Sequence, residues 1–123
     1  MRKPLIAIVD DDPSVRKALE RLLKAAGFEA TSFASALEFL QERRATIPEC
    51  LVLDIHLGGM NGFELYEQLV SEGSAVPVVF ITAHDDASTR EHARERGGYL
   101  RKPFEQHALL GAIYRALNQE TAE

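Results

Sequence analysis

The sequence predicts an α/β fold in which a parallel five-stranded sheet carries helices on both faces. Short apolar runs, of a length typical of buried strands, recur along the chain. Between them lie segments whose apolar residues follow the helical period. Glycine and proline separate the two kinds of segment, and strands that alternate with helices in this way form parallel sheets.

The first half of the chain begins with the apolar run Leu5 to Val9, which predicts a buried strand. A helix is expected from about Pro13 to Ala26, because Asp12 can cap it and proline is favoured at its first position. Gly27 is a natural stop for this helix. The remaining elements expected in this half are an edge strand over 28–33, a short helix around 36–40 capped by Ser32 or Ser35, and a strand over 50–53.

The second half continues the alternation after a glycine-rich loop. We expect helices over 62–72, 85–96 and 104–118, strands over 77–81 and 99–100, and a frayed tail over 119–123. Right-handed crossovers leave few ways to order the strands, and the flavodoxin-like (βα)5 order 2-1-3-4-5 is the leading one. The first and third strands are then neighbours, and their C-terminal ends border the crevice where such sheets bind ligands.

Composition limits the function classes that need to be considered. A chain of 123 residues is one domain by length, and its net charge of −5 argues against direct binding of nucleic acid. No apolar run approaches the roughly 20 residues needed to span a membrane. The single cysteine, Cys50, excludes an internal disulfide, and we expect it to be a buried, inert thiol. These features predict a cytoplasmic domain without membrane contact.

The chemically informative residues follow the predicted strands. Asp10, Asp11 and Asp12 come directly after the first strand, and Asp54 follows the third. Clustered carboxylates repel one another, so either their pKa values rise or a cation lies among them. Oxygen ligands of this kind suit Mg²⁺. The sequence therefore predicts a magnesium site beside a reactive aspartate at this edge of the sheet.

Two further polar residues are delivered to the same edge. Thr82 follows the fourth strand, and Lys102 follows the fifth strand, directly before Pro103. A hydroxyl and an ammonium group around an aspartate can stabilise phosphoryl oxygens. Aspartate can itself be the nucleophile in phosphoryl transfer and form an acyl phosphate.

With these residues, the chain resembles response-regulator receiver domains, the phospho-accepting half of two-component signalling. The resemblance covers essentially the whole chain, and the segment 31–40 is similar to receivers that precede LuxR-type output modules. It implies a receiver domain over 1–123 without an output module, either a stand-alone regulator or an excised domain. The motifs that carry the resemblance are Ile8-Val9-Asp10-Asp11, Leu53-Asp54, Met60-Asn61-Gly62, Ile81-Thr82-Ala83 and Lys102-Pro103-Phe104.

The resemblance implies roles for the residues at the acidic edge. Asp54 would accept the phosphoryl group, and Asp11, Asp54 and the backbone carbonyl of His56 would bind Mg²⁺ directly. Asp10 would act mainly through metal-bound water. Lys102 would contact the phosphoryl group, and its bond to the following proline is expected to be cis.

The resemblance also implies a switch. Thr82 would swing to the phosphoryl oxygen, and Tyr99, at the aromatic switch position of the family, would turn inward with it. The side chains of His56 and His84 stand where members of the family border the attacking water. They either tune dephosphorylation or are simply exposed to solvent.

The implied phosphodonor is a histidine kinase or a histidine phosphotransfer protein. The phosphorylated form would act on an unknown downstream protein or a missing output domain, as a monomer or as a phosphorylation-dependent dimer. The domain would catalyse only its own phosphorylation and slow dephosphorylation, and would not be an enzyme for an external substrate.

Other interpretations remain open from the sequence. The main alternative is a pseudo-receiver, an interaction module of the same fold that works without phosphorylation. A phosphatase of the haloacid-dehalogenase type would need a second acid where His56 stands, and a cap domain. A flavodoxin would need a phosphate-binding loop after the first strand. A zinc site built from His56, His84, His92 and His107 has no suitable ligand spacing.

The chain departs from the family in two places. Gly58-Gly59 replaces a usual proline position, so we expect a more mobile loop and looser metal geometry at His56. The stretch between Thr82 and Lys102 is shorter than usual, and its predicted helix, with Asp85 and Asp86 in the first turn, contains few apolar residues. We expect this helix to be shortened, displaced or mobile, which puts standard dimerisation and switching in doubt.

Overall fold

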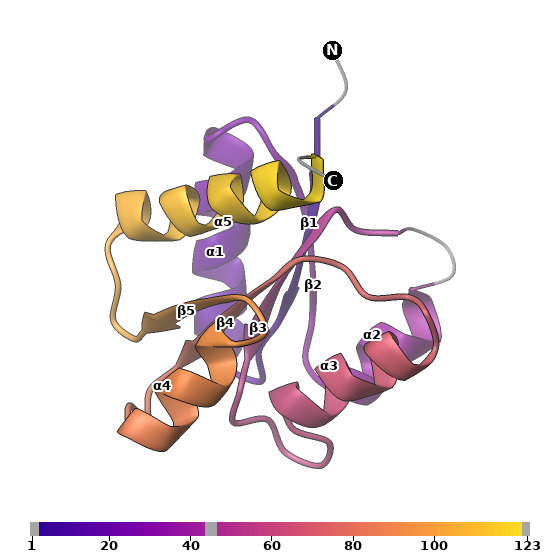
Figure 1. The fold of residues 1–123 in the computed structure, drawn as a ribbon. Helices are drawn as coiled ribbons and strands as arrows, with labels where there is room; N and C mark the ends of the chain where they lie inside the picture. Colours follow the sequence, from indigo (N-terminus) through magenta and orange to yellow (C-terminus); the bar gives the residue numbers. More distant parts are fainter. Residues whose placement is uncertain (1–2, 44–46, 122–123) are drawn as a thin grey trace.

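A computed structural model describes residues 3–43 and 47–121, with only the backbone described for 119–121. Figure 1 shows a central sheet with helices on both faces. The elements are β1 (Leu5–Val9), α1 (Pro13–Ala25), β2 (Glu29–Phe33), α2 (Ala36–Glu42), β3 (Cys50–Asp54), α3 (Gly62–Ser71), β4 (Val78–Thr82), α4 (Ala87–Arg94), β5 (Gly98–Arg101) and α5 (Gln106–Thr121).

The sheet has the strand order that the sequence predicts. All five strands are parallel, in the order β2-β1-β3-β4-β5. The strands at the two edges are only partly buried, which confirms the edge position expected for residues 28–33. This order makes β1 and β3 neighbours, so the residues at their C-terminal ends lie next to each other.

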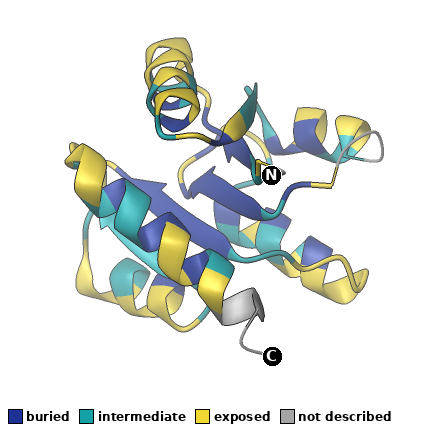
Figure 2. Ribbon diagram, turned by 90° about the horizontal axis from the view of Figure 1, so that it is seen from above, coloured by how far each residue is buried: buried dark blue, intermediate teal, exposed yellow. Residues whose placement is uncertain are grey.

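Two apolar layers bury the central strands. Because side chains alternate along a strand, Ile6 and Ile8 of β1 pack toward α1 and α5, whereas Ala7 and Val9 pack toward α2, α3 and α4. Figure 2 shows the buried sheet between helices whose outer faces are exposed. Cys50 is fully buried in the first of these layers, as expected. The central strands therefore form a rigid support for the residues at their ends.

The helix caps follow the local sequence. The Asp12 side chain accepts a hydrogen bond from the backbone N–H of Ser14 and caps α1, as predicted. Gly27, with φ of 96°, ends that helix region. Ser35, rather than Ser32, caps α2 by accepting from the backbone of its third residue. Among the described helices, none is long and apolar enough to cross a membrane.

The C-terminal helix differs from the prediction at both ends. It begins at Gln106 instead of residue 104 and extends to Thr121, so residues 119–121 are helical where a frayed tail was expected. The apolar pattern that located the helix ends near Leu117, but no glycine or proline follows to stop it. Residues 122–123 of the predicted tail lie outside the described part of the chain.

Helix α4 is short, as its lack of apolar residues predicted. It spans eight residues, and Ala93 is its only buried one. Asp86 is its N-cap, so Asp85 and Asp86 precede the first turn instead of lying in it. The ring of His92 packs edge-on against Phe63 of α3. Just after the helix, the Arg96 guanidinium lies 3.4 Å from a Glu67 carboxylate oxygen of α3.

We predict that α4 opens locally more often than its neighbours, because it buries so little apolar surface. Native-state hydrogen exchange should show faster exchange for the backbone amides of α4 than for those of α3 and α5. Equal protection of the three helices would show that polar contacts alone fix α4 in place.

The loop between β3 and α3 approaches the sheet closely at one glycine. A Cβ atom on Gly62 would lie 2.6 Å from the backbone oxygen of Asp54 and 2.9 Å from the Cα atom of Ile55. A Cβ atom on Gly58 would meet nothing within 4 Å. Gly62 is therefore required by a close approach to the strand that carries Asp54.

We expect Gly62→Ala to lower the free energy of unfolding by about 1–3 kcal/mol, the usual range for overpacking a tight contact. Urea denaturation of Gly62→Ala and of the matched control Gly58→Ala measures this effect. The control should unfold at nearly the wild-type urea concentration or slightly higher. Equal losses in both variants would mean that the close approach is not the cause.

Candidate functional site

Three acidic side chains meet at the C-terminal edge of the sheet. One carboxylate oxygen from each of Asp10, Asp11 and Asp54 lies within 4.8 Å of the others. Asp10 is fully buried and Asp54 is 4% exposed, whereas Asp11 is exposed to solvent. The cluster forms because β1 and β3 pair in parallel, with Val9 opposite Leu53. The structure thus brings together the acids that the sequence placed at one edge.

Lys102 supplies the positive charge in this cluster. Its Nζ atom donates to Asp10 Oδ2 at 2.7 Å and lies 3.4 Å from Asp54 Oδ2. The backbone N–H of Lys102 donates to the carbonyl oxygen of Thr82 at 2.7 Å, which fixes the residue just after β5. The bond from Lys102 to Pro103 is cis, as predicted.

Backbone donors hold the other oxygens of the two buried carboxylates. The N–H of Asp12 donates to Asp10 Oδ1 at 2.9 Å, and the N–H of His56 donates to Asp54 Oδ1 at 3.1 Å. Each carboxylate therefore has one oxygen toward the lysine and one toward the loop that follows its own strand. This fixes both groups before any ligand binds.

Burial is the main electrostatic influence on the predicted phosphoacceptor. It raises the pKa of Asp54, the charge of Asp10 raises it further, and Lys102 and the His56 N–H oppose the rise. Burial works to lower the pKa of Lys102, but its hydrogen bond to Asp10 and the charges of both acids outweigh burial and raise it. The pKa of Asp54 is therefore raised even though Lys102 lies beside it.

The cluster has the donor chemistry of a hard-cation site. All three acidic groups offer oxygen, and the Lys102 ammonium pairs with only two of them, Asp10 and Asp54, so negative charge remains for a cation to neutralise. These residues fit Mg²⁺, with Asp11 giving access from the solvent side. The backbone of His56 borders the cluster through its N–H, and metal binding by its carbonyl stays a prediction.

Thr82 lies at the end of β4, fully buried, but it is not hydrogen-bonded to the acids. Its hydroxyl donates to the carbonyl oxygen of His84 at 3.2 Å and accepts from the His84 N–H at 3.0 Å. The hydroxyl is thus held by the loop between β4 and α4. A phosphoryl group on Asp54 would have to draw it away from that loop.

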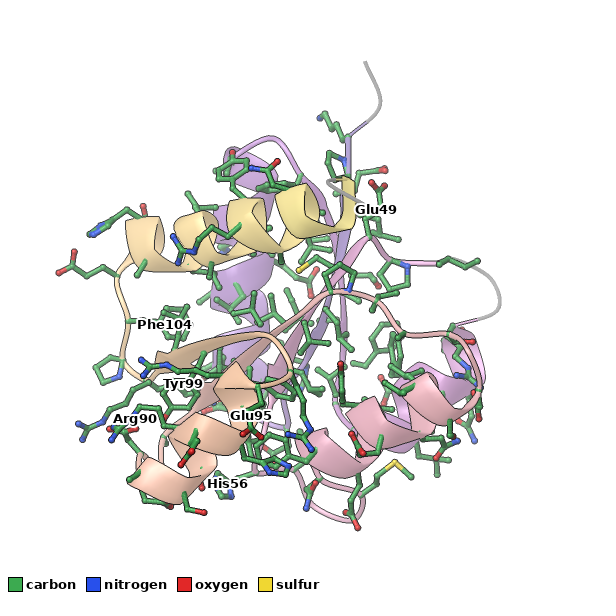
Figure 3. The ribbon with its side chains drawn as sticks, in the orientation of Figure 1. Glu49, His56, Arg90, Glu95, Tyr99 and Phe104 are labelled. Carbon is green, nitrogen blue, oxygen red and sulfur yellow. The ribbon has the colours of Figure 1, made fainter. Side chains whose placement is uncertain are left out.

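Tyr99 of β5 is held by the same loop. Its hydroxyl donates a short hydrogen bond to Asp85 Oδ1, and Arg90 Nη1 donates to both oxygens of Asp85 at 3.0 Å. The Arg94 guanidinium lies over the ring of Tyr99, 5.7 Å from its centre. In Figure 3, Tyr99 and Arg90 approach each other from β5 and α4.

Sequence reasoning missed three contributors to this region. Asp85 is expected from the sequence in the first turn of a helix, and no role is expected for Arg90, although together they hold Tyr99. Arg16 of α1 donates to the backbone oxygen of Asp10 at 2.8 Å and steadies the first loop of the site. No local pattern marks these roles, because each contact joins separate elements.

The histidines do not gather into a single site. The rings of His56 and His84 are in edge contact, with centres 4.7 Å apart, beside the acidic cluster. His92 packs against α3, and His107 pairs with Glu105 before α5. In the part of the chain that the structure describes, the acidic cluster is the only group of three or more candidate metal ligands. A zinc site therefore gains no support.

Comparison with known proteins identifies relatives of similar sequence. Nodulation protein W of Bradyrhizobium diazoefficiens is 34% identical over 120 residues, which cover 96% of this chain and 53% of that protein. Response regulator protein TodT of Pseudomonas putida is 36% identical over 118 residues, which cover 94% of this chain and 52% of that protein. The chain thus spans about half the length of these curated relatives.

The structural and family comparisons agree with the sequence relatives. The solved structure of response regulator StyR has a TM-score of 0.87 and 46% identity, over 98% of this chain and 62% of that one. The family model described as the response regulator receiver domain matches residues 6–114. The chain therefore belongs to the family of response regulator receiver domains.

Proposed function

We propose that Asp54 accepts a phosphoryl group in a Mg²⁺-dependent reaction, and that phosphorylation changes the affinity of the domain for a downstream partner. The observation that carries this proposal is the buried carboxylate of Asp54, held 3.4 Å from the Lys102 ammonium and beside two further acids. The phosphodonor would be a histidine kinase or a histidine phosphotransfer protein, as expected for a receiver domain of two-component systems.

In the proposed reaction, a carboxylate oxygen of Asp54 attacks the phosphorus of a phosphohistidine. A P–O bond forms, the P–N bond breaks, and the imidazole nitrogen leaves with the electron pair. Lys102 already lies beside Asp54, and its ammonium group would stabilise the negative charge on the phosphoryl oxygens. Mg²⁺ bound by Asp11 and Asp54, with Asp10 acting through water, would supply further neutralisation of those oxygens.

Phosphorylation would then act on Thr82. The group adds about −1.5 to −2 charges and new acceptor oxygens beside a hydroxyl that now bonds only to His84. Transfer of that hydroxyl to the phosphoryl group would shift the β4–α4 loop and Tyr99 between two arrangements. His56 and His84, whose rings touch beside the cluster, would border the attacking water and tune dephosphorylation.

The proposed activity is limited to the domain itself and its signalling partners. The domain would catalyse only its own phosphorylation and slow dephosphorylation, in the cytoplasm. Since the chain spans about half the length of its curated relatives, its downstream partner is either a separate protein or an output domain. It would act as a monomer or as a phosphorylation-dependent dimer. A phosphorylation-independent interaction module is the alternative that the next experiment separates.

Intact mass after incubation with acetyl phosphate and Mg²⁺ tests the proposal. We expect one phosphoryl adduct on the wild type, and none with Asp54→Asn or after removal of Mg²⁺. Asp12→Asn is the matched control: it also removes one acid near the site, but asparagine still caps α1, so the adduct should remain.

An adduct that persists in Asp54→Asn would place the phosphoacceptor elsewhere. If the wild type forms no adduct and shows no metal-dependent binding of beryllium fluoride, the phosphorylation-independent alternative is correct. Binding of beryllium fluoride without an adduct would identify acetyl phosphate as too weak a donor, and a phosphohistidine donor should then label Asp54.

The raised pKa of Asp54 predicts that this carboxylate destabilises the folded protein at neutral pH. Below the ordinary value of 3.8, both folded and unfolded chains hold the proton and no penalty exists. As pH rises, the unfolded chain ionises first, so stability is lost until the folded-state pKa is passed. Without Mg²⁺, Asp54→Asn should therefore melt at a higher temperature than the wild type at pH 7.

Thermal melts between pH 3 and pH 8 measure this difference, which should shrink toward the acidic end. Asp12→Asn should change the melting temperature little, and Mg²⁺ should stabilise the wild type more than Asp54→Asn. A lower melting temperature for Asp54→Asn at pH 7 would contradict the prediction.

A further inference from the structure

The β4–α4 loop holds both switch residues through two consecutive positions. The backbone of His84 makes both hydrogen bonds to the Thr82 hydroxyl. The side chain of the next residue, Asp85, accepts the hydrogen bond from Tyr99. A movement of the loop that frees one switch residue therefore disturbs the contact of the other.

Asp85 is bound on two sides by different elements. The Tyr99 hydroxyl reaches it from β5, and Arg90 contacts both of its oxygens from α4. Its side chain is 17% exposed, so these bonds are partly shielded from water. Arg101 adds positive charge nearby. One carboxylate thus connects the loop, the edge strand and the helix.

The protonation equilibria agree with this geometry. The hydrogen bond from Tyr99 is the main cause of a lowered pKa at Asp85, with Arg90 and Arg101 acting in the same direction. Burial, followed by the bond and charge of Asp85, raises the pKa of Tyr99 to about 12. At neutral pH the pair is therefore a phenol that donates to a full carboxylate, which is a charge-assisted hydrogen bond.

We propose that Asp85 is a positioning residue of the switch, which holds Tyr99 and, through Arg90, α4 in the resting arrangement. We call the contacts of Asp85 with Tyr99 and Arg90 the resting-state lock. When Thr82 leaves the His84 backbone for a phosphoryl oxygen, the β4–α4 loop moves and the contacts of this lock break. The proposal rests on the proposed function, because the phosphoryl group is the ligand that draws Thr82 away. It goes further, because it assigns the stability of the resting arrangement to a residue outside the acidic cluster.

Because α4 is weakly packed, the contacts of Asp85 can determine the position of the helix. With Ala93 as the one buried residue in the helix, the apolar core contributes little to where α4 lies. Its position then depends on polar contacts, and two of these join the helix to the β4–α4 loop: the Asp86 cap and the Asp85–Arg90 pair. Of the two, the Asp85–Arg90 pair is the one that shares its carboxylate with Tyr99. A ligand shifts such an equilibrium only by its preference for one state, so weakening the resting state makes activation easier.

The test compares Asp85→Ala and the near-isosteric Asp85→Asn with Glu91→Ala. The control removes the same charge from an exposed position on α4. The first readout is the ring signal of Tyr99 in tyrosine-labelled NMR spectra at neutral pH, identified among the three tyrosines with Tyr99→Phe. In Asp85→Ala without ligand, the signal should move toward the position that Mg²⁺ and beryllium fluoride produce in the wild type.

The second readout is the affinity for beryllium fluoride in the presence of Mg²⁺. Loss of a charge-assisted bond that exists only in the resting state should tighten binding on the order of tenfold in Asp85→Ala. Asp85→Asn should change both readouts in the same direction but less, and Glu91→Ala should match the wild type. Weaker or unchanged binding in both Asp85 variants, with an unmoved Tyr99 signal, would overturn the proposal.

Failure of this proposal is distinguishable from failure of the proposed function. If the wild type binds beryllium fluoride and the Asp85 variants bind no better, the lock is wrong while phosphorylation of Asp54 stands. If the wild type does not bind beryllium fluoride, the proposed function fails. In that case, a Tyr99 signal that is the same in the ligand-free wild type and in Asp85→Ala would exclude the lock as well. Should Asp85→Ala not fold, Asp85→Asn decides both readouts.

Discussion

The site depends on the Lys102 ammonium between the carboxylates of Asp10 and Asp54. Both acids are almost entirely buried at the ends of neighbouring strands, where an unpaired charge is strongly unfavourable. Lys102 follows β5, the strand at the far edge of the sheet. The hydrogen bond from its backbone N–H to the Thr82 carbonyl oxygen fixes how far its side chain has to reach to the two acids. The strand order of the sheet therefore also determines which charged groups meet in the site.

The molecule divides into a rigid part and an adaptable part. Apolar layers on both faces fix the central strands, and with them the acidic cluster. The β4–α4 loop and α4 are fixed mainly by polar contacts around Asp85 and by an edge contact of His92 with α3. Polar contacts exchange partners at small energetic difference, whereas a packed core does not. A rigid acidic cluster beside a loop and helix with little apolar packing is the arrangement that the proposed switch requires.

One of the two departures expected from the sequence lies in the adaptable part. The stretch between Thr82 and Lys102, which we expect to be shorter than usual in the family, contains Gly97, where a side chain would collide with the backbone of Val78. Helix α4, in the same stretch, has eight residues. The hydrogen bond from Tyr99 to Asp85 shows that β5 and the β4–α4 loop are in contact.

From the sequence alone one can predict the order of elements, the strand order, the Asp12 cap of α1, and the acids, threonine and lysine at one edge. These features depend on local periodicity, on turn residues and on which residue ends a strand, all of which can be read over a few positions. Only the tertiary structure shows that Asp85 holds Tyr99 and that His56 touches His84. Such contacts depend on how packed elements are oriented in space, and that orientation leaves no local pattern in the chain.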